Sequence, residues 1–181
     1  MLVVDPAEEY AGQTVQVSNE QEFADALRRS PGRWRLSYFN THLEDDFAAL
    51  CATVSELGSC TFVVEEADWY CSPSAIHPGL AYLLKYGRHD AVEVWCIARR
   101  PSELHRLCTS MAKGVFCFQT VEPNDKKYLQ DYVSSVFADD LADLPPLVCK
   151  QQLRVVGATP TYWRVDPRLA TIVPVVVESK A

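Results

Sequence analysis

The chain has 181 residues, of which 48% are hydrophobic and 23% charged, and it carries a formal net charge of −7. This composition is that of an ordinary globular protein of one-domain length, and it excludes a disordered or collagen-like chain. The negative charge argues against a strong nucleic-acid binder, because basic side chains that neutralise phosphates supply most of the affinity of such proteins.

Nothing in the sequence indicates a membrane protein. No apolar run approaches the roughly 20 residues that a membrane span needs, and the first residues do not form a signal peptide. The seven cysteines include no C-x-x-C pair and lie mostly within apolar runs, which fits free thiols in a reducing compartment. We therefore expect a cytoplasmic protein that does not bind membranes.

Short apolar runs alternate with amphipathic stretches along most of the chain. In chain order, the pattern predicts a strand at residues 2–4, a helix around 23–27, a strand at 33–39, a helix at 47–57, a strand at 61–64, a helix at 80–86, a strand at 92–98, a helix at 102–111, a strand at 115–118 and a helix from 124. Ser18, followed by Gln21 three residues later, predicts a capping box at the first helix.

This alternation predicts the fold class. Strands that alternate with helices form βαβ units, so we expect a three-layer α/β fold with a mainly parallel sheet. After Pro145-Pro146 the pattern changes to strand-like runs at residues 153–156, 162–165 and 171–177. We interpret residues 1–145 as the α/β core and residues 146–181 as a small β-rich appendage.

Charged residues follow two of the predicted strands at their carboxyl ends, where open α/β sheets bind ligands. Glu65 and Glu66 follow the strand at 61–64, and Arg99 and Arg100 follow the strand at 92–98. Arg88 ends the helix that leads into the latter strand. Because parallel strands bring their tips together, we expect the two glutamates, Arg88 and Arg99 to gather along one rim of the sheet.

Two carboxylates at a strand end suit metal-assisted phosphoryl transfer, in which one supports Mg²⁺ and the other orients the attacking water. The same pattern also occurs in solvated turns. Arg88 is equally well explained by the dipole of the helix that it ends, and Arg99 by an ion pair with a nearby acid such as Asp68.

Several segments follow one another in a fixed order. They are Leu2-Val-Val-Asp-Pro, Thr61-Phe-Val-Val-Glu-Glu-Ala-Asp, Leu84-Lys-Tyr-Gly-Arg-His, Val94-Trp-Cys-Ile-Ala-Arg-Arg-Pro, Val115-Phe-Cys-Phe-Gln and Asn124-Asp125. Over about residues 2–133 this order resembles the second half of a HerA/FtsK-type DNA-translocating ATPase. The resemblance implies a RecA-like, P-loop-NTPase-like core with a Walker B strand at 61–66 and its last strand at 115–118.

The resemblance also implies ligands and roles. It implies ATP and Mg²⁺ as ligands, and a ring of subunits that moves DNA in packaging or conjugation. Glu66 matches the carboxylate that polarises water, and Glu65 takes the place of the Asp that supports Mg²⁺. Arg88 matches an arginine that reaches a neighbouring subunit's nucleotide. Arg99 and Arg100 are candidate phosphate contacts, although the family usually has Gln at the position of Arg99.

The 181 residues contain no G-x-x-x-x-G-K-[ST] phosphate loop, and the seven glycines are spread singly. Without that loop no backbone nest cradles the phosphates. We therefore expect this chain to neither hydrolyse ATP independently nor bind ATP and Mg²⁺ tightly. In the family the missing segment lies upstream of Leu2 and includes a central strand, so the sheet must close the gap or borrow a strand.

Two functions stay open at this point. One is an active motor whose phosphate loop comes from upstream sequence or from another chain. The other is a non-catalytic module that assembles with itself or with an ATPase subunit. In both cases we expect self-association or binding to such a subunit, and contact with DNA only indirectly or within a ring.

Overall fold

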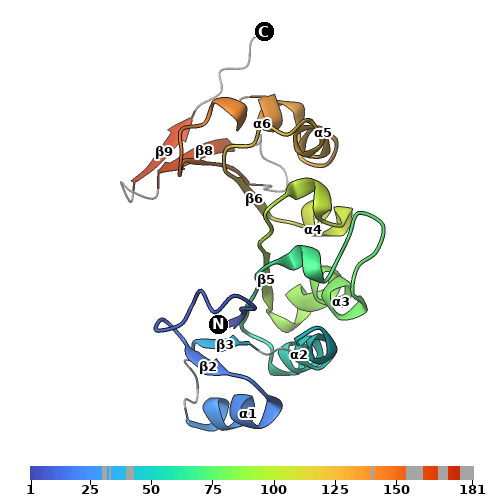
Figure 1. The fold of residues 1–181 in the computed structure, drawn as a ribbon, viewed down its shortest axis with the longest axis vertical. Helices are drawn as coiled ribbons and strands as arrows, with labels where there is room; N and C mark the ends of the chain where they lie inside the picture. Colours follow the sequence, from blue (N-terminus) through green and yellow to red (C-terminus); the bar gives the residue numbers. More distant parts are fainter. Residues whose placement is uncertain are drawn as a thin grey trace. The chain divides into compact units, whose positions relative to one another are not determined.

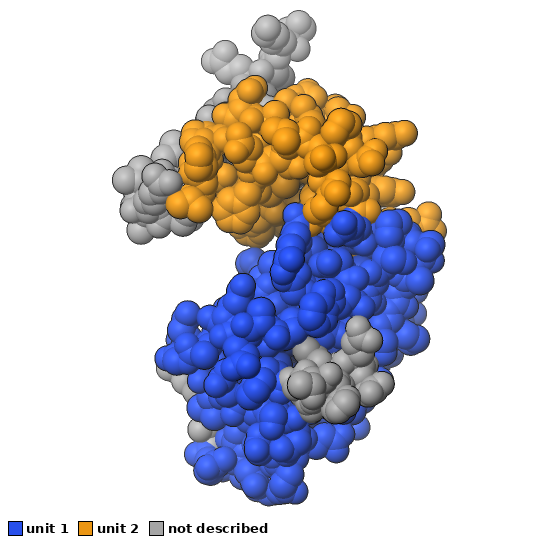
Figure 2. All heavy atoms as spheres, viewed as in Figure 1, with its two compact units in different colours: residues 1–99, 103–105 blue, residues 100–102, 106–181 orange. Residues whose placement is uncertain are grey.

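The computed structural model describes residues 1–29, 32, 34–39, 43–139, 141–153, 161–166 and 171–175. The chain divides into two compact units, which Figure 2 shows in blue and orange. Unit 1 comprises Met1–Arg99 and Glu103–His105, and unit 2 comprises Arg100–Ser102 and Arg106–Ala181. This division falls near residue 100, whereas the domain boundary that we expect from the sequence pattern, between residues 145 and 146, stays a prediction.

Unit 1 is built on a five-stranded parallel sheet with the strand order β2-β3-β1-β4-β5. Figure 1 labels β2, β3 and β5 of this sheet. The strands are β1 (Leu2–Val4), β2 (Val15–Val17), β3 (Leu36–Tyr38), β4 (Thr61–Val64) and β5 (Glu93–Cys96). The helices are α1 (Glu20–Arg29), α2 (Leu43–Leu57) and α3 (Pro78–Tyr86), with short 3-10 turns η1 (Ala67–Trp69) and η2 (Gly87–Asp90). The predicted α/β fold with a mainly parallel sheet is confirmed.

The core of unit 1 lies around its two neighbouring central strands. All three residues of β1 are 0% exposed, as are Phe62 and Val64 of β4. Phe47 of α2 stacks on Tyr70 with the ring centroids 3.7 Å apart, and both belong to the same buried cluster as these strands. Burial on both faces explains why these strands read as continuous apolar runs in the sequence.

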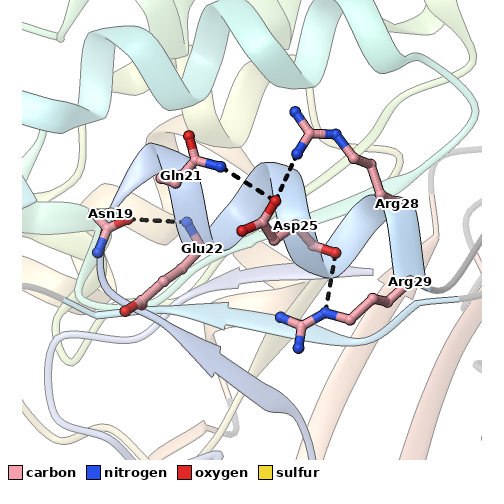
Figure 3. Close-up of polar contacts among 6 residues, drawn as sticks. All are labelled: Asn19, Gln21, Glu22, Asp25, Arg28 and Arg29. Atoms are coloured by element: carbon pink, nitrogen blue, oxygen red, sulfur yellow. Dashed lines mark hydrogen bonds and ion pairs between the residues drawn. The ribbon is translucent and has the colours of Figure 1, made fainter.

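Helix α1 starts at a different cap from the one predicted. Oδ1 of Asn19 accepts the backbone N–H of Glu22 at 2.9 Å (Figure 3). The Glu22 carboxylate accepts the backbone N–H of Ser18 at 2.8 Å and its hydroxyl at 3.0 Å. Asn19 therefore caps the helix, and the Glu22 carboxylate binds Ser18, one residue before the cap. The predicted capping box of Ser18 with Gln21 is wrong, because the helix begins one residue further on.

Unit 2 contains a four-stranded antiparallel sheet with the order β6-β7-β8-β9. Its strands are β6 (Gly114–Cys117), β7 (Cys149–Leu153), β8 (Thr161–Asp166) and β9 (Thr171–Val175). Its helical elements are η3 (Pro101–Glu103), α4 (Arg106–Ser110), α5 (Pro123–Tyr132), α6 (Ser135–Asp139) and η4 (Leu141–Asp143), some of whose residues belong to unit 1 by the division above. No helix in the described part of the chain is long and apolar enough to cross a membrane.

Strand β6 corrects one expectation. It pairs antiparallel with β7, so residues 115–118 do not form the last strand of the parallel core. Of its last two residues, Phe116 is exposed and Cys117 is buried, as in an antiparallel sheet that has one covered face. The predicted runs at residues 162–165 and 171–175 lie in β8 and β9. Of the predicted run at 153–156 only Leu153 lies in a strand, the end of β7, and residues 154–156 and 176–177 lie outside the described residues.

Candidate functional site

The carboxyl ends of β1, β4 and β5 meet at one edge of the parallel sheet, which we call the carboxyl rim. Asp5 follows β1, Glu65 and Glu66 follow β4, and Arg99 follows β5 after two intervening residues. The structure therefore brings Glu65, Glu66 and Arg99 together, because parallel strands of matching register end side by side.

Glu66 and Arg99 form an ion pair on this rim. Nε and an Nη atom of Arg99 both donate to Oε1 of Glu66, at 3.0 and 2.5 Å. The side chain of Glu66 is 14% exposed and that of Arg99 is 78% exposed. Glu66 adopts a left-handed backbone with φ of 49°, at the start of η1. Hydrogen bonding to Glu66 raises the pKa of Arg99.

The partner of Arg99 differs from the acid suggested by the sequence. Arg99 pairs with Glu66, and Asp68 acts on it only as a more distant charge. Oδ1 of Asp68 is buried and has no hydrogen-bond partner within the described residues. The carboxylate that the resemblance assigns to water polarisation is therefore already occupied by a guanidinium.

Glu65 is held by a tyrosine that the sequence did not single out. The hydroxyl of Tyr10 donates a hydrogen bond to Oε1 of Glu65. Burial raises the pKa of Glu65, and the nearby charges of Glu9, Asp5 and Glu66 raise it further, while the Tyr10 hydrogen bond acts in the opposite direction. Burial and the contact with Glu65 also raise the pKa of Tyr10.

Asp5 fixes the turn that carries Tyr10. Its side chain is 0% exposed, and its two oxygens accept the backbone N–H groups of Glu9 at 2.8 Å and Tyr10 at 3.0 Å. Its own backbone N–H donates to the carbonyl of Tyr38 on β3 at 3.0 Å. The rule that selected Glu65 also applies to Asp5, since it follows a buried strand directly, so the sequence contained a signal for this residue.

Arg88 does not lie on the carboxyl rim. It belongs to η2, which precedes β5, so it lies at the amino ends of the strands. The neighbouring Asp90 accepts the backbone N–H of Ser59, just before β4, at 2.8 Å. The expectation of a single rim is wrong for Arg88, because a residue between a helix and the next parallel strand lies at the opposite edge from the strand tips.

Arg100 belongs to unit 2 and contacts acids there. Its Nε lies 3.3 Å from Oδ2 of Asp125, and an Nη atom lies 3.6 Å from Glu122. Oδ1 of Asp125 also accepts the backbone N–H of Ser102 at 3.1 Å and its hydroxyl at 2.5 Å. Asp125 is 3% exposed and belongs to α5, so these hydrogen bonds connect the start of η3 to α5. The assignment of Arg100 to phosphate binding stays a prediction.

The donor atoms of the rim suit Mg²⁺ only in part. Carboxylate oxygens are the ligands that Mg²⁺ prefers, but Glu65 and Glu66 both accept hydrogen bonds from protein side chains. Within the ranges that the structure describes, no group of three or more His, Cys, Asp or Glu residues is placed to hold a metal ion. For ATP the sequence lacks the glycine-rich cradle altogether, so these residues alone do not fit the nucleotide.

No protein-family model matches the sequence, and no curated protein matches it either. Solved structures do match. The genome packaging NTPase B204 from Sulfolobus turreted icosahedral virus 2, in complex with AMPPCP, has a TM-score of 0.70 and 16% identity, and the match covers 96% of this chain and 80% of that chain. The same protein in complex with ATP-gammaS has a TM-score of 0.68 and 16% identity, and the match covers 96% of this chain and 79% of that chain.

A third structure is B204, the DNA-packaging ATPase from Sulfolobus Turreted Icosahedral Virus. It has a TM-score of 0.69 and 15% identity, and the match covers 89% of this chain and 80% of that chain. At such identities the likeness concerns the fold. The chain shares the RecA-like P-loop NTPase fold of these packaging NTPases.

Proposed function

We propose that unit 1 is the carboxylate-bearing part of a packaging-ATPase-type nucleotide site of the HerA/FtsK kind, and that the chain does not hydrolyse ATP by itself. The observation that carries the proposal is the carboxyl rim: Glu65 and Glu66 directly follow a buried parallel strand and lie beside Arg99. This is the edge at which α/β sheets bind their ligands. The fold shared with nucleotide-bound packaging NTPases supports the proposal.

Two features support the lack of independent hydrolysis. The 181 residues contain no phosphate loop, and a carboxylate pair does not replace the binding energy that such a loop contributes. The carboxylates are also engaged by Tyr10 and Arg99. When bound, Mg²⁺ would neutralise phosphate charge; Glu65 is the residue that would support it, and Glu66 the residue that would orient water once Arg99 releases it.

The alternative is an active motor completed by a phosphate loop from outside these residues. In that case Arg88, which is exposed at the opposite edge of the sheet, acts on the nucleotide of a neighbouring subunit, and Arg99 and Arg100 contact phosphate. A non-catalytic assembly module is the third reading. Each reading makes the chain a homo-oligomer or a partner of an ATPase subunit, with DNA reached through the assembly.

We place the protein in the cytoplasm. All seven cysteines lie in the described part of the chain, and none is in a disulfide. Burial raises the pKa of Cys51 and Cys117 to about 12, so these thiols stay protonated and inert at neutral pH. Buried, protonated thiols fit a reducing compartment.

The proposal is tested by titrating the purified chain with fluorescent ATP in the presence of Mg²⁺. We expect no tight binding and no phosphate release. Glu65→Ala and Glu66→Gln should then behave like the unchanged chain, as should the control Glu93→Gln, which alters an exposed glutamate at the start of β5. Tight binding that either rim variant abolishes, and the control does not, would contradict the proposal that the chain is inactive alone.

A further inference from the structure

Helix α3 is capped by a histidine. His77 directly precedes the helix, and its Nδ1 accepts the backbone N–H of Gly79 at 3.1 Å. The first N–H groups of a helix have no partner within the helix, so this acceptor satisfies one of them. Caps are usually serine, threonine, asparagine or aspartate, whose side chains accept hydrogen bonds at neutral pH. An imidazole nitrogen accepts only while it carries no proton, so this cap depends on pH.

The surroundings of His77 favour the neutral ring. The imidazole is half-buried and meets the ring of Phe47 edge to face, with the centroids 5.0 Å apart and the planes at 82°. Phe47 is 0% exposed and also stacks on Tyr70, an uncharged phenol. Burial lowers the pKa of His77. The contact with Gly79 assigns the proton of the neutral ring to Nε2.

The titratable groups on the elements around His77 do not supply a compensating charge. On α2, Cys51 lies beside the first turn of α3, and burial raises the pKa of this thiol to about 12, so it is neutral. Asp46 of α2 accepts the hydroxyl of Tyr38 on β3 at 3.1 Å. On α3 itself the basic residue is Lys85, in the last turn. Among the described residues, burial alone accounts for the lowered pKa of His77.

The cap connects α3 to the carboxyl rim. From Glu66 the chain passes through η1 to Tyr70, whose carbonyl accepts the backbone N–H of His77 at 2.8 Å. An antiparallel bridge between Cys71 and Ile76 closes the segment between them. We call residues 70–77 the rim hairpin. His77 is bound to the rim hairpin through its backbone and to α3 through its side chain.

We propose that His77 is a pH-sensitive cap, which holds the first turn of α3 to the rim hairpin while its imidazole is neutral and releases that turn when the imidazole is protonated. A proton on Nδ1 prevents this nitrogen from accepting the N–H of Gly79. The positive charge also lies at the positive end of the helix dipole, where it is unfavourable. The device belongs to the fold of unit 1 and does not depend on nucleotide binding.

The direction of the pH effect follows from linkage. A histidine whose pKa is lower in the folded than in the unfolded chain binds a proton less readily when folded. Its contribution to stability is therefore complete above the unfolded pKa of 6.5 and is lost as the pH falls below that value. The first turn of α3 should loosen on mild acidification.

The test measures amide hydrogen exchange by NMR on the whole chain, labelled with ¹⁵N, at about pH 7.5 and about pH 5, on either side of the ordinary histidine pKa. Each rate is corrected for the intrinsic pH dependence of exchange. We expect the protection of the Gly79 amide to fall by about threefold or more at the lower pH. The amide of Val92, which donates to the carbonyl of Gly87 at the other end of α3 at 2.8 Å, should keep its protection.

A matched pair of variants assigns the effect to His77. His77→Asn keeps a good cap acceptor that does not titrate, so the protection of Gly79 should be the same at both pH values. His89→Asn changes an exposed histidine in η2 and should keep the pH dependence of the unchanged chain.

Equal protection of Gly79 at the two pH values in the unchanged chain would overturn the inference. The same loss of protection in His77→Asn would also overturn it, because another group then titrates. If His77→Asn does not fold, the ¹⁵N shifts of the His77 ring in the unchanged chain provide the test. Gain of a proton at Nδ1 in step with the loss of Gly79 protection would support the cap, and a proton on Nδ1 already at neutral pH would refute it.

Discussion

Glu65 is a partly buried carboxylate among other carboxylates, which makes its ionisation unfavourable. Burial is the main cause that raises its pKa above the usual 4.5, and Glu9, Asp5 and Glu66 add to it. A carboxyl group whose pKa is higher in the folded than in the unfolded chain binds a proton more readily when folded. Its ionisation therefore destabilises the fold as the pH rises above the ordinary value.

We predict that Glu65→Gln raises the melting temperature at pH 7, because the amide carries no charge to desolvate, and that the gain shrinks as the pH falls towards about 4.5. Thermal unfolding followed by circular dichroism across this range measures the effect. Glu93→Gln, at an exposed glutamate, is the matched control and should not change the melting temperature. An unchanged or lower melting temperature for Glu65→Gln at pH 7 would contradict the prediction.

The hydroxyl of Tyr10 makes one specific contact, with the Glu65 carboxylate. We predict that Tyr10→Phe lowers the free energy of unfolding by about 1 kcal/mol, since it removes a hydrogen bond to a partly buried acceptor and leaves the ring in place. Urea denaturation measures the loss. Tyr82→Phe, which removes a hydroxyl from a half-exposed ring on α3, should not measurably lower the free energy of unfolding. Equal effects of the two variants would refute a role for the Tyr10 hydroxyl.

The residues of the rim differ in how far the sequence reveals them. Glu65, Glu66 and Arg99 can be found because they follow apolar runs, and the ends of parallel strands converge. Tyr10 cannot be found in this way, since it reaches Glu65 across 55 positions of sequence and only after Asp5 has fixed the turn between them. Arg99 pairs with Glu66 and not with Asp68, and periodicity does not encode this choice between two nearby acids.

Helix α1 shows how local contacts define an element. Asp25 accepts hydrogen bonds from Gln21 at 3.2 Å and from Arg28 at 2.6 Å, and all three lie on the exposed side of the helix (Figure 3). Such exposed pairs contribute little to the stability of a helix, so the cap at Asn19 contributes more than they do. We predict that Asn19→Ala costs about 1 kcal/mol of stability in urea denaturation, because the N–H of Glu22 loses its acceptor.

A conservative change at the same position provides the control. Asn19→Asp keeps an oxygen that accepts from Glu22, and the negative charge at a helix N-terminus is favourable, so this variant should be as stable as the unchanged chain. A loss in Asn19→Asp as large as in Asn19→Ala would mean that Asn19 acts through its amide N–H₂ group and not as a cap.

At the scale of the elements, the end of α2 is easier to predict than the pairing of strands. Gly58 follows α2 with φ of 56°, a conformation that glycine adopts without strain, and the sequence indicates this end. The pairing of β6 was predicted wrongly, because an apolar run of four residues does not encode its partner. That partner, β7, lies more than thirty positions away and is chosen by the packing of unit 2.

For the whole molecule, the sequence predicts the class of fold because the class depends on a repeated pattern. Many runs would have to be misassigned before the alternation of strands and helices was lost. The division into two units depends instead on which contacts form between distant segments. The position of β5 belongs to the same scale: its apolar residues indicate an interior strand, and only the assembled sheet shows that it lies at an edge of the described strands.

Net charge is also a property of the whole molecule, and it limits what the chain does with DNA. With a net charge of −7 and an acidic carboxyl rim, the chain alone has few cations to displace the counterions of a duplex. We predict that it binds duplex DNA more weakly than about 10⁻⁴ M at physiological salt, measured by fluorescence anisotropy.

The salt dependence of the same measurement separates two explanations of any weak binding. Affinity that depends on phosphate contacts falls steeply as salt rises, in proportion to the number of phosphates neutralised. We expect a shallow dependence for this chain, because its net charge of −7 favours few phosphate contacts. Micromolar binding with a steep salt dependence would require a basic face on the single chain, and DNA would then be a direct ligand of that chain.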